Sequence, residues 1–316
     1  MRKILFFSLI FFAAALPAQQ LPEFTQFPSI LWQINPAYTG TKSTIDARLD
    51  YRKQWMGYDG APVTQFAGVN SRLWKGRLGV GGTLYKDETG PSRRFIYSFQ
   101  AAYHLKLPDV EFCAGFSMNF DKYTLDETKM TTHWTNDPLV NNTLIDFDKN
   151  KNATGGVLLY NDRFHFGLAI TNFIDTHADF FTTDTTGSRV NYKAHYYFTC
   201  GYNFNKNPDY VWENNIMGTY VAGLPMTLDY NLRVHYKEKI LAGFAWRLRD
   251  ALSLQAGYVL FESVQVIYSY DFGISPLRKA HSGTHELMIG YRWNFGQHKG
   301  GYRNFDDFQK QKYHIF

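Results

Sequence analysis

Residues 94–120 read RFIYSFQAAYHLKLPDVEFCAGFSMNF, and apolar and polar side chains alternate along both halves of this stretch. In the first half the apolar face carries Phe95, Tyr97, Phe99, Ala101, Tyr103, Leu105 and Leu107, and the opposite face carries Arg94, Ser98, Gln100, His104 and Lys106. In the second half the apolar residues are Val110, Phe112, Ala114, Phe116, Met118 and Phe120, opposite Glu111, Ser117 and Asn119. A period of two residues is typical of a β-strand whose faces meet different environments. Because Pro108-Asp109 favours a tight turn between the halves, the stretch predicts a β-hairpin.

The same alternation recurs throughout residues 45–295, and it is clear again in residues 224–237 and 284–295. The predicted strands are residues 45–53, 64–74, 77–86, 94–107, 110–120, 152–161, 163–171, 192–206, 211–222, 224–237, 239–248, 251–260, 263–273 and 284–295. Several are longer than the about 5–6 residues common in soluble sheets. They match the about 9–11 residues that a tilted strand needs to cross a bilayer. The sequence thus predicts an all-β fold, a transmembrane antiparallel β-barrel of about 14 strands. A large aromatic-rich soluble sandwich is the competing explanation.

The connections between the predicted strands fall into two classes. Those after even-numbered strands are short, at residues 75–76, 108–109, 161–162, 207–210, 238 and 261–262. The long ones all follow odd-numbered strands, at residues 54–63, 87–93, 121–151, 172–191 and 274–283. Outer-membrane barrels have short periplasmic turns and longer extracellular loops. We therefore expect the long connections outside the cell and both termini in the periplasm.

Three segments lie outside the predicted barrel, which spans residues 45–295. Residues 1–18 have a basic start, a thirteen-residue apolar run and small alanines, as in a cleaved signal peptide. As a helix that run would reach roughly 20 Å, short of the roughly 30 Å hydrocarbon core, which argues against an anchoring helix. Residues 19–44, with three prolines, predict an extended periplasmic lead, and residues 296–316 a charged, aromatic periplasmic tail.

Composition excludes several classes of function. The net charge of +5 is mild and no block of like charges occurs, so nucleic acid is not an expected partner. The mean hydropathy of −0.35 suits a barrel whose apolar residues alternate with polar ones, and the 18% of aromatic residues suits belts at two membrane interfaces. Cys113 and Cys200 fall on opposite strand faces, and no Cys-x-x-Cys pair occurs, so neither a disulfide nor a thiolate zinc site is expected.

Catalytic motifs are also missing from the sequence. It contains no His-Glu-x-x-His, Gly-x-Ser-x-Gly or phosphate-binding loop, so we predict no enzyme, no cofactor and no metal site. A hydrolase assembled from scattered Ser and His on the barrel wall stays a minor alternative. A polar network, or pore selectivity, is the interpretation of the charged residues predicted to face the lumen, namely Arg94, Glu111, Asp229, Arg233, His235, Lys237 and Arg292.

The N-terminal third carries a distinctive order of short motifs, TQFPSILWQINPAYTG at residues 25–40 and RLDYRKQWMGYDGAPVT at residues 48–64. Together they resemble the PorP/SprF family of the type IX secretion system of Bacteroidetes. The matching positions are Thr25, Gln26, Asn35, Pro36, Ala37, Tyr38, Gly40, Arg52, Gln54, Trp55, Gly57, Gly60, Ala61, Pro62 and Thr64. The rest of the chain resembles the family only in architecture, and the tail after Phe295 departs from it.

The resemblance implies a non-enzymatic component of type IX secretion and gliding machinery in the outer membrane of a Gram-negative bacterium. It further implies periplasmic ring proteins or lipoproteins as partners, and a large exported cargo or adhesin with a C-terminal sorting domain. A porin-like channel for small solutes is the alternative, since about 14 strands enclose a lumen.

Two sets of residues are the predicted sites. In the loop predicted to be extracellular, the candidates for partner binding are Arg52, Gln54, Trp55, Tyr58 and Pro62, because Trp and Arg are effective interface anchors. The alternative is a purely structural role, in which Trp55 belongs to an aromatic belt and Pro62 to a turn. In the lead, a motif that either closes the periplasmic mouth or docks a partner consists of Asn35, Pro36, Ala37, Tyr38 and Gly40.

Overall fold

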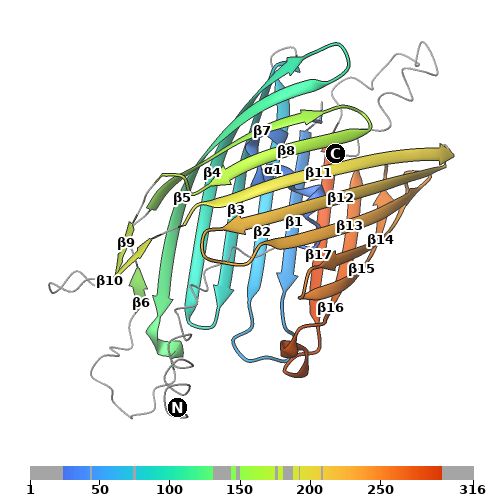
Figure 1. The fold of residues 1–316 in the computed structure, drawn as a ribbon. Helices are drawn as coiled ribbons and strands as arrows, with labels where there is room; N and C mark the ends of the chain where they lie inside the picture. Colours follow the sequence, from blue (N-terminus) through green and yellow to red (C-terminus); the bar gives the residue numbers. More distant parts are fainter. Residues whose placement is uncertain are drawn as a thin grey trace, which may run out of the picture.

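The computed structural model describes residues 24–42, 45–73, 76–130, 144–146, 150–174, 177–180, 188–191, 193–207 and 209–293. Fourteen strands pair antiparallel with their neighbours and close into a barrel (Figure 1), because the first strand also pairs with the last. These strands are β1 (Ile45–Lys53), β2 (Val63–Leu73), β3 (Leu78–Thr89), β4 (Ser92–Lys106), β5 (Glu111–Asp126), β7 (Asn150–Tyr160), β8 (Phe164–Thr171), β11 (His195–Asn207), β12 (Tyr210–Val221), β13 (Thr227–Tyr236), β14 (Ile240–Arg247), β15 (Ala251–Leu260), β16 (Val264–Gly273) and β17 (Thr284–Trp293).

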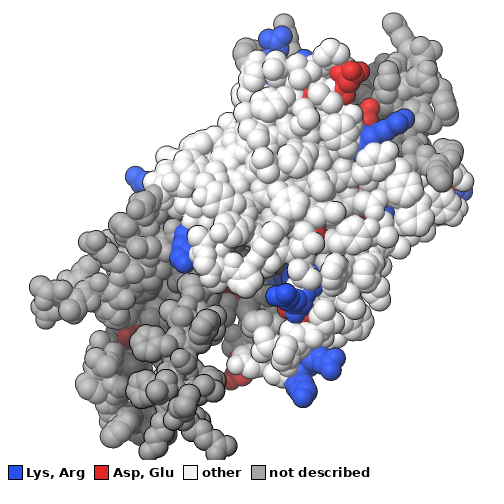
Figure 2. All heavy atoms as spheres, in the orientation of Figure 1, with Lys and Arg blue, Asp and Glu red and all other residues white. Residues whose placement is uncertain are grey.

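The two faces of each strand differ as the sequence predicted. Along β4, for example, Phe99 is 65% exposed on the outer face, whereas its neighbours Ser98 and Gln100 are buried on the inner face. Figure 2 shows the result on one side of the barrel, where a broad band is almost free of charged residues and Lys, Arg, Asp and Glu gather toward its edges. Such a band is the surface that a barrel presents to lipid. No helix among the described residues is long and apolar enough to span a bilayer.

The predicted strand order and count are confirmed, and most boundaries agree to within a few residues. One predicted loop is wrong. Residues 87–93 do not form a long connection, because Glu88 pairs with Arg93 across the strands and only Gly90-Pro91 forms the turn. Gly90 has a φ of +55°, the left-handed conformation that such a tight turn favours in glycine.

Three of the remaining long connections, those after β5, β8 and β16, carry small elements of their own. They hold η5 (Glu127–Lys129), the short strand β6 (Leu144–Asp146) beside β5, a hairpin of β9 (His177–Phe180) and β10 (Ser188–Asn191), and η6 (Pro276–Lys279). The predicted signal peptide, residues 19–23 of the lead and the tail at residues 296–316 lie outside the described residues.

The largest difference from the sequence prediction concerns residues 24–42, which we call the plug. They fold into η2 (Phe27–Ser29), α1 (Leu31–Ile34) and η3 (Pro36–Tyr38), and nearly all of their side chains are buried. Figure 1 shows these dark-blue turns inside the barrel. The expectation of an extended lead outside the barrel is therefore wrong for these residues. The plug can be buried because polar side chains of the inner wall replace water as hydrogen-bond partners of its backbone and side chains.

Candidate functional site: the plugged lumen

The local sequence explains why the plug folds into short turns. Pro28 and Pro36 each stand in the first turn of a 3-10 helix, where their fixed φ is favourable and no N–H is needed. Asn35 caps the second of these helices, since its side-chain oxygen accepts a hydrogen bond from the Ala37 N–H at 2.9 Å. The Asn-Pro-Ala-Tyr motif is thus first of all a helix-capping signal.

Wall glycines make room for this motif. A Cβ atom at Gly115 would lie 2.2 Å from the Ala37 nitrogen, and one at Gly156 would lie 2.1 Å from the Asn35 side-chain oxygen. At Gly79 it would lie 1.9 Å from the Thr39 carbonyl oxygen. Real Cβ contacts do not approach so closely, so β3, β5 and β7 form a shallow groove that admits the plug backbone only because these positions are glycines.

Polar side chains then fix the motif in the groove. The Asn35 amide donates to the backbone carbonyl of Val157 at 3.1 Å and to that of Leu168 at 3.3 Å. The Tyr38 hydroxyl lies 2.5 Å from His165 Nδ1 and 2.8 Å from Thr199 Oγ1. Because these partners come from β7, β8 and β11, one short segment of the plug holds three strands together.

Next to Gly79, a histidine and a cysteine lie against the plug. His104 Nε2 lies 2.9 Å from the Thr39 carbonyl oxygen, and Cys113 Sγ lies 2.9 Å from His104 Nδ1. Cys113 is fully buried, whereas Cys200 lies on the outer face, so the predicted separation of the two thiols is confirmed. The side chain of His104 therefore lies between the Cys113 thiol and the plug.

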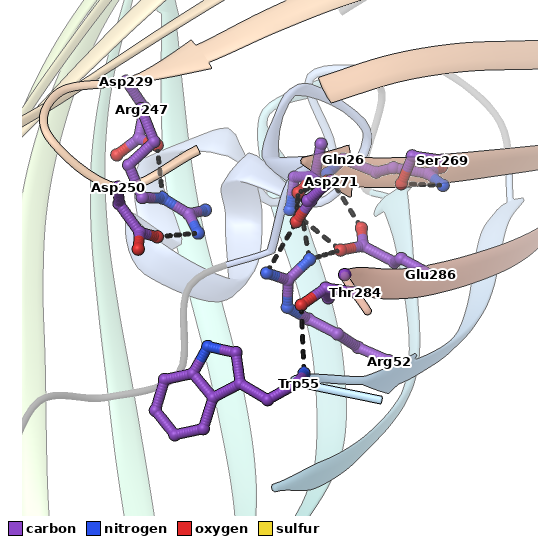
Figure 3. Close-up of polar contacts among 12 residues, drawn as sticks. Gln26, Arg52, Trp55, Asp229, Arg247, Asp250, Ser269, Asp271, Thr284 and Glu286 are labelled. Carbon is purple, nitrogen blue, oxygen red and sulfur yellow. Dashed lines mark hydrogen bonds and ion pairs between the residues drawn. The ribbon is translucent and has the colours of Figure 1, made fainter. Parts of the chain in front are cut away.

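The other end of the plug is held by a buried ionic cluster on β1, β16 and β17 (Figure 3). Arg52 bridges Glu286 at 2.6 Å and Asp271 at 2.8 Å, and all three side chains are almost completely buried. Glu286 also accepts the backbone N–H groups of Thr25 and Gln26, at 2.9 and 2.8 Å. Loss of one partner from such a buried cluster typically costs about 3–5 kcal/mol, because the other charge stays buried without compensation.

Further contacts hold this end of the plug. The Thr25 hydroxyl donates to Asp271 at 2.8 Å and accepts from Arg52 at 2.9 Å. The ring of Phe24 packs edge-on against Phe66 and Tyr85 on the neighbouring strands β2 and β3. The plug is thus attached by polar contacts along its length and by an aromatic contact at its first described residue.

The plug passes along the lumen from one end of the barrel toward the other. Thr25 is level with Arg52 and Glu286, at the strand ends that lead into the long connections. Gly40 contacts Asn70 and Gly79, near the ends that carry the short turns. The prediction that the lead closes only the mouth with the short turns is therefore wrong for residues 24–42, which run along the lumen.

The predicted partner-binding residues separate into two groups. Arg52 and Pro62 are buried, and Arg52 anchors the plug, so the prediction of Arg52 as a surface contact is wrong. Strand parity explains this result, since Arg52 shares the inner face of β1 with Asp46, Arg48 and Asp50. Gln54 and Trp55 are partly exposed, and Tyr58 is 53% exposed.

The loop that carries Trp55 is joined to a second long connection. Trp55 has a φ of +47°, and its backbone N–H donates to Thr284 Oγ1 at 3.2 Å (Figure 3). Met56 exchanges backbone hydrogen bonds of 2.8 Å with Gly283 and Ser282. Residues 54–62 and 274–283 therefore form one connected surface at this mouth of the barrel.

Sequence reasoning missed the acidic half of the ionic cluster. Asp271 and Glu286 belong to strands in which apolar and polar residues alternate, and no local motif marks either residue. Only their position on the polar face of the strand indicated that they face the lumen. Among the described residues, no group of three or more His, Cys, Asp or Glu side chains is arranged to hold a metal ion.

A comparison with family models adds the decisive observation: the model described as "Type IX secretion system membrane protein PorP/SprF" matches residues 16–291. The chain belongs to the PorP/SprF family. The match spans the plug as well as nearly all of the barrel. The suspected family resemblance is confirmed.

Solved structures show the same fold at low sequence identity. A FadL homologue of Pseudomonas aeruginosa is 11% identical, with 83% of this chain and 93% of that chain covered and a TM-score of 0.53. The toluene transporter TodX of Pseudomonas putida is 10% identical, with 85% and 94% covered and a TM-score of 0.50. A search of curated proteins gave no match. The likeness shows the β-barrel fold, and the family supports an outer-membrane location and a role in type IX secretion.

Proposed function

We propose that this PorP/SprF protein is a closed outer-membrane component of type IX secretion and gliding machinery that helps to export cargo proteins with C-terminal sorting domains or to anchor them at the cell surface. The observation that carries the proposal is the family match over residues 16–291, which includes the plug. A lumen filled by buried, hydrogen-bonded chain is suited to a scaffold rather than to free diffusion of solutes.

In this proposal the long connections face outside and the connected surface of residues 54–62 and 274–283 contacts the cargo. Trp55 and Tyr58 offer aromatic side chains at a rigid site, and such residues dominate binding energy at many interfaces. Arg52 and Pro62 take no part in the contact because they are buried. Periplasmic ring proteins or lipoproteins bind at the opposite mouth, which carries the short turns and the last residues of β17.

The test is surface retention of cargo in cells that carry Trp55→Ala with Tyr58→Ala. We expect cargo to be released into the medium while barrel levels stay unchanged. Phe261→Ala is the matched control, since Phe261 is 88% exposed on a short turn at the other mouth. Unchanged retention in the double variant would refute the assignment of this surface.

Affinity purification of the tagged full chain from solubilised outer membranes tests the wider proposal. Recovery of a large exported protein or of periplasmic ring components supports it. A barrel that is recovered alone would favour the second candidate, a porin-like channel.

The observation that favours a channel is the similarity of fold to a toluene transporter. Planar-bilayer recording of the purified chain separates the two candidates. A plugged scaffold gives no steady current, and a channel gives one.

A further inference from the structure

The outer wall of the barrel contains an apolar groove over β17, β1, β2, β3 and β4, with a volume of about 410 Å³. This volume lies within the range of clefts that bind small molecules. Its outward-facing apolar lining consists of Leu49, Ala67, Leu84, Phe95, Leu287 and Ile289. Strand pairing aligns the small Ala67 between Leu49 and Leu84, so the lining has a small side chain between two large ones. Since this face meets lipid, an acyl chain is the natural occupant.

Cations gather at one end of the groove, on the side of the long connections. On the outer face, pairing aligns Tyr51, Gln65, Lys86, Phe95 and Lys122 in one row, and Lys53, Val63, Glu88, Arg93 and Thr124 in the next. These ten positions contain four cations and one carboxylate. Lys86 and Arg93 share that carboxylate, with distances of 3.1 and 2.6 Å to Glu88 Oε1. The cluster therefore keeps an excess of positive charge beside the end of an apolar groove.

The positions of the cations and of the groove indicate at which depth in the membrane each of them lies. A charged side chain on the lipid face costs about 2–4 kcal/mol at the middle of the bilayer and little near its interfaces. Lys86 and Arg93 thus mark the level of the headgroups, and the groove extends from there toward the bilayer centre. A ligand that fits both parts has a phosphate at the headgroup level and an acyl chain attached below it.

We propose that this groove binds lipid A, the phosphorylated glycolipid of the outer leaflet, with one acyl chain over Ala67 and a phosphate on Lys86 and Arg93. The choice of outer leaflet rests on the proposed function, in which the long connections face outside. A phosphate is the group expected there, because ammonium and guanidinium groups bind it through charge-assisted hydrogen bonds.

The experiment is native mass spectrometry of the full chain purified from outer membranes in mild detergent, with bound lipid identified after release. Ala67→Leu fills the groove, and Ala101→Leu places the same side chain on the outer face of β4, outside the groove. Lys86→Gln with Arg93→Gln removes the phosphate contacts. Lys106→Gln with Lys239→Gln removes two exposed charges at the opposite mouth.

Wild-type protein and both controls should retain lipid A in stoichiometric amount. Ala67→Leu should retain less lipid A because the new side chain occupies the space of the acyl chain. Lys86→Gln with Arg93→Gln should retain at least roughly tenfold less lipid A, since one hydrogen bond to a charged group typically contributes a factor of this size. The charge variant keeps the experiment valid if the packing variant does not fold. Equal retention by the charge variant, or retention of an ordinary phospholipid in place of lipid A, would overturn the proposal. Neither result would affect cargo retention, which tests the proposed function separately.

Discussion

Replacement of Asn35 by Ala should loosen the plug without changing the barrel wall. The Asn35 side chain makes hydrogen bonds to Ala37 N, Val157 O and Leu168 O, at 2.9, 3.1 and 3.3 Å. The first of these bonds lies within the plug, and the other two join the plug to the wall. Each contributes about 0.5–1.5 kcal/mol net, so the variant loses about 2 kcal/mol of plug attachment. Since about 1.4 kcal/mol corresponds to a tenfold change, the fraction of molecules with a displaced plug should rise roughly 30-fold.

The Cys113 thiol reports this displacement. It is fully buried behind His104, whose ring contacts the Thr39 carbonyl of the plug. A small polar maleimide should therefore react with Cys113 only when the plug has moved. With Cys200 replaced by Ala, the rate of labelling is proportional to the displaced fraction as long as the plug returns faster than it is labelled.

Asn214→Ala is the matched control. Asn214 also makes side-chain hydrogen bonds, to Tyr202 and Tyr230, but it lies on the outer face of β12 and contacts no part of the plug. Its replacement should leave labelling unchanged. Labelling of Asn35→Ala at the parental rate, or an equal rise in both variants, would refute the assignment of Asn35 as an attachment point of the plug.

Three further outcomes follow from the same geometry. Glu286→Gln leaves Arg52 with one carboxylate fewer, so the variant should lose about 3 kcal/mol of stability and unfold at a lower temperature, whereas Glu262→Gln on an exposed turn should leave the unfolding temperature unchanged. Gly115→Val places a side chain where the Ala37 backbone lies, so the plug of any barrel that forms should become sensitive to protease; resistance equal to wild type would contradict this. Asn35→Ala should show brief conductance openings in planar bilayers that the full wild-type chain lacks, and identical traces would count against a displaceable plug.

The barrel was predictable because its signal is repeated. Every strand carries the same alternation of apolar and polar residues, and a strand shifted by one residue would expose its polar face to lipid. Independent evidence came from the alternation of short and long connections. The error at residues 87–93 arose where Glu88 and Arg93 satisfy each other on the outer face, so two polar residues extended the strands rather than the loop.

The plug was not predictable from its own residues. Its prolines and polar side chains are equally typical of an exposed lead, and nothing in a single sequence states that Gly115 leaves space for Ala37 and Gly156 for Asn35, more than seventy residues earlier in the chain. The same holds for Arg52, whose nearest carboxylates lie on β16 and β17. Long-range complementarity of this kind becomes visible only when the sheet has closed.

The two ends of the plug act together in keeping the lumen closed. At one end, Glu286 accepts the backbone N–H groups of Thr25 and Gln26, and hydrogen bonds to a charged group contribute about 1.5–3 kcal/mol each. At the other end, the two bonds from Asn35 to the wall contribute about 2 kcal/mol together. If the plug leaves only when both sets of bonds are broken, the cost is about 6 kcal/mol, which leaves roughly one molecule in 20,000 open at equilibrium. That fraction is too small for a general diffusion pore, and it supports a closed scaffold for secretion. Arg52 and Trp55 lie three residues apart in the chain. A cargo that binds the surface at residues 54–62 would therefore contact the end of β1 that also holds the plug.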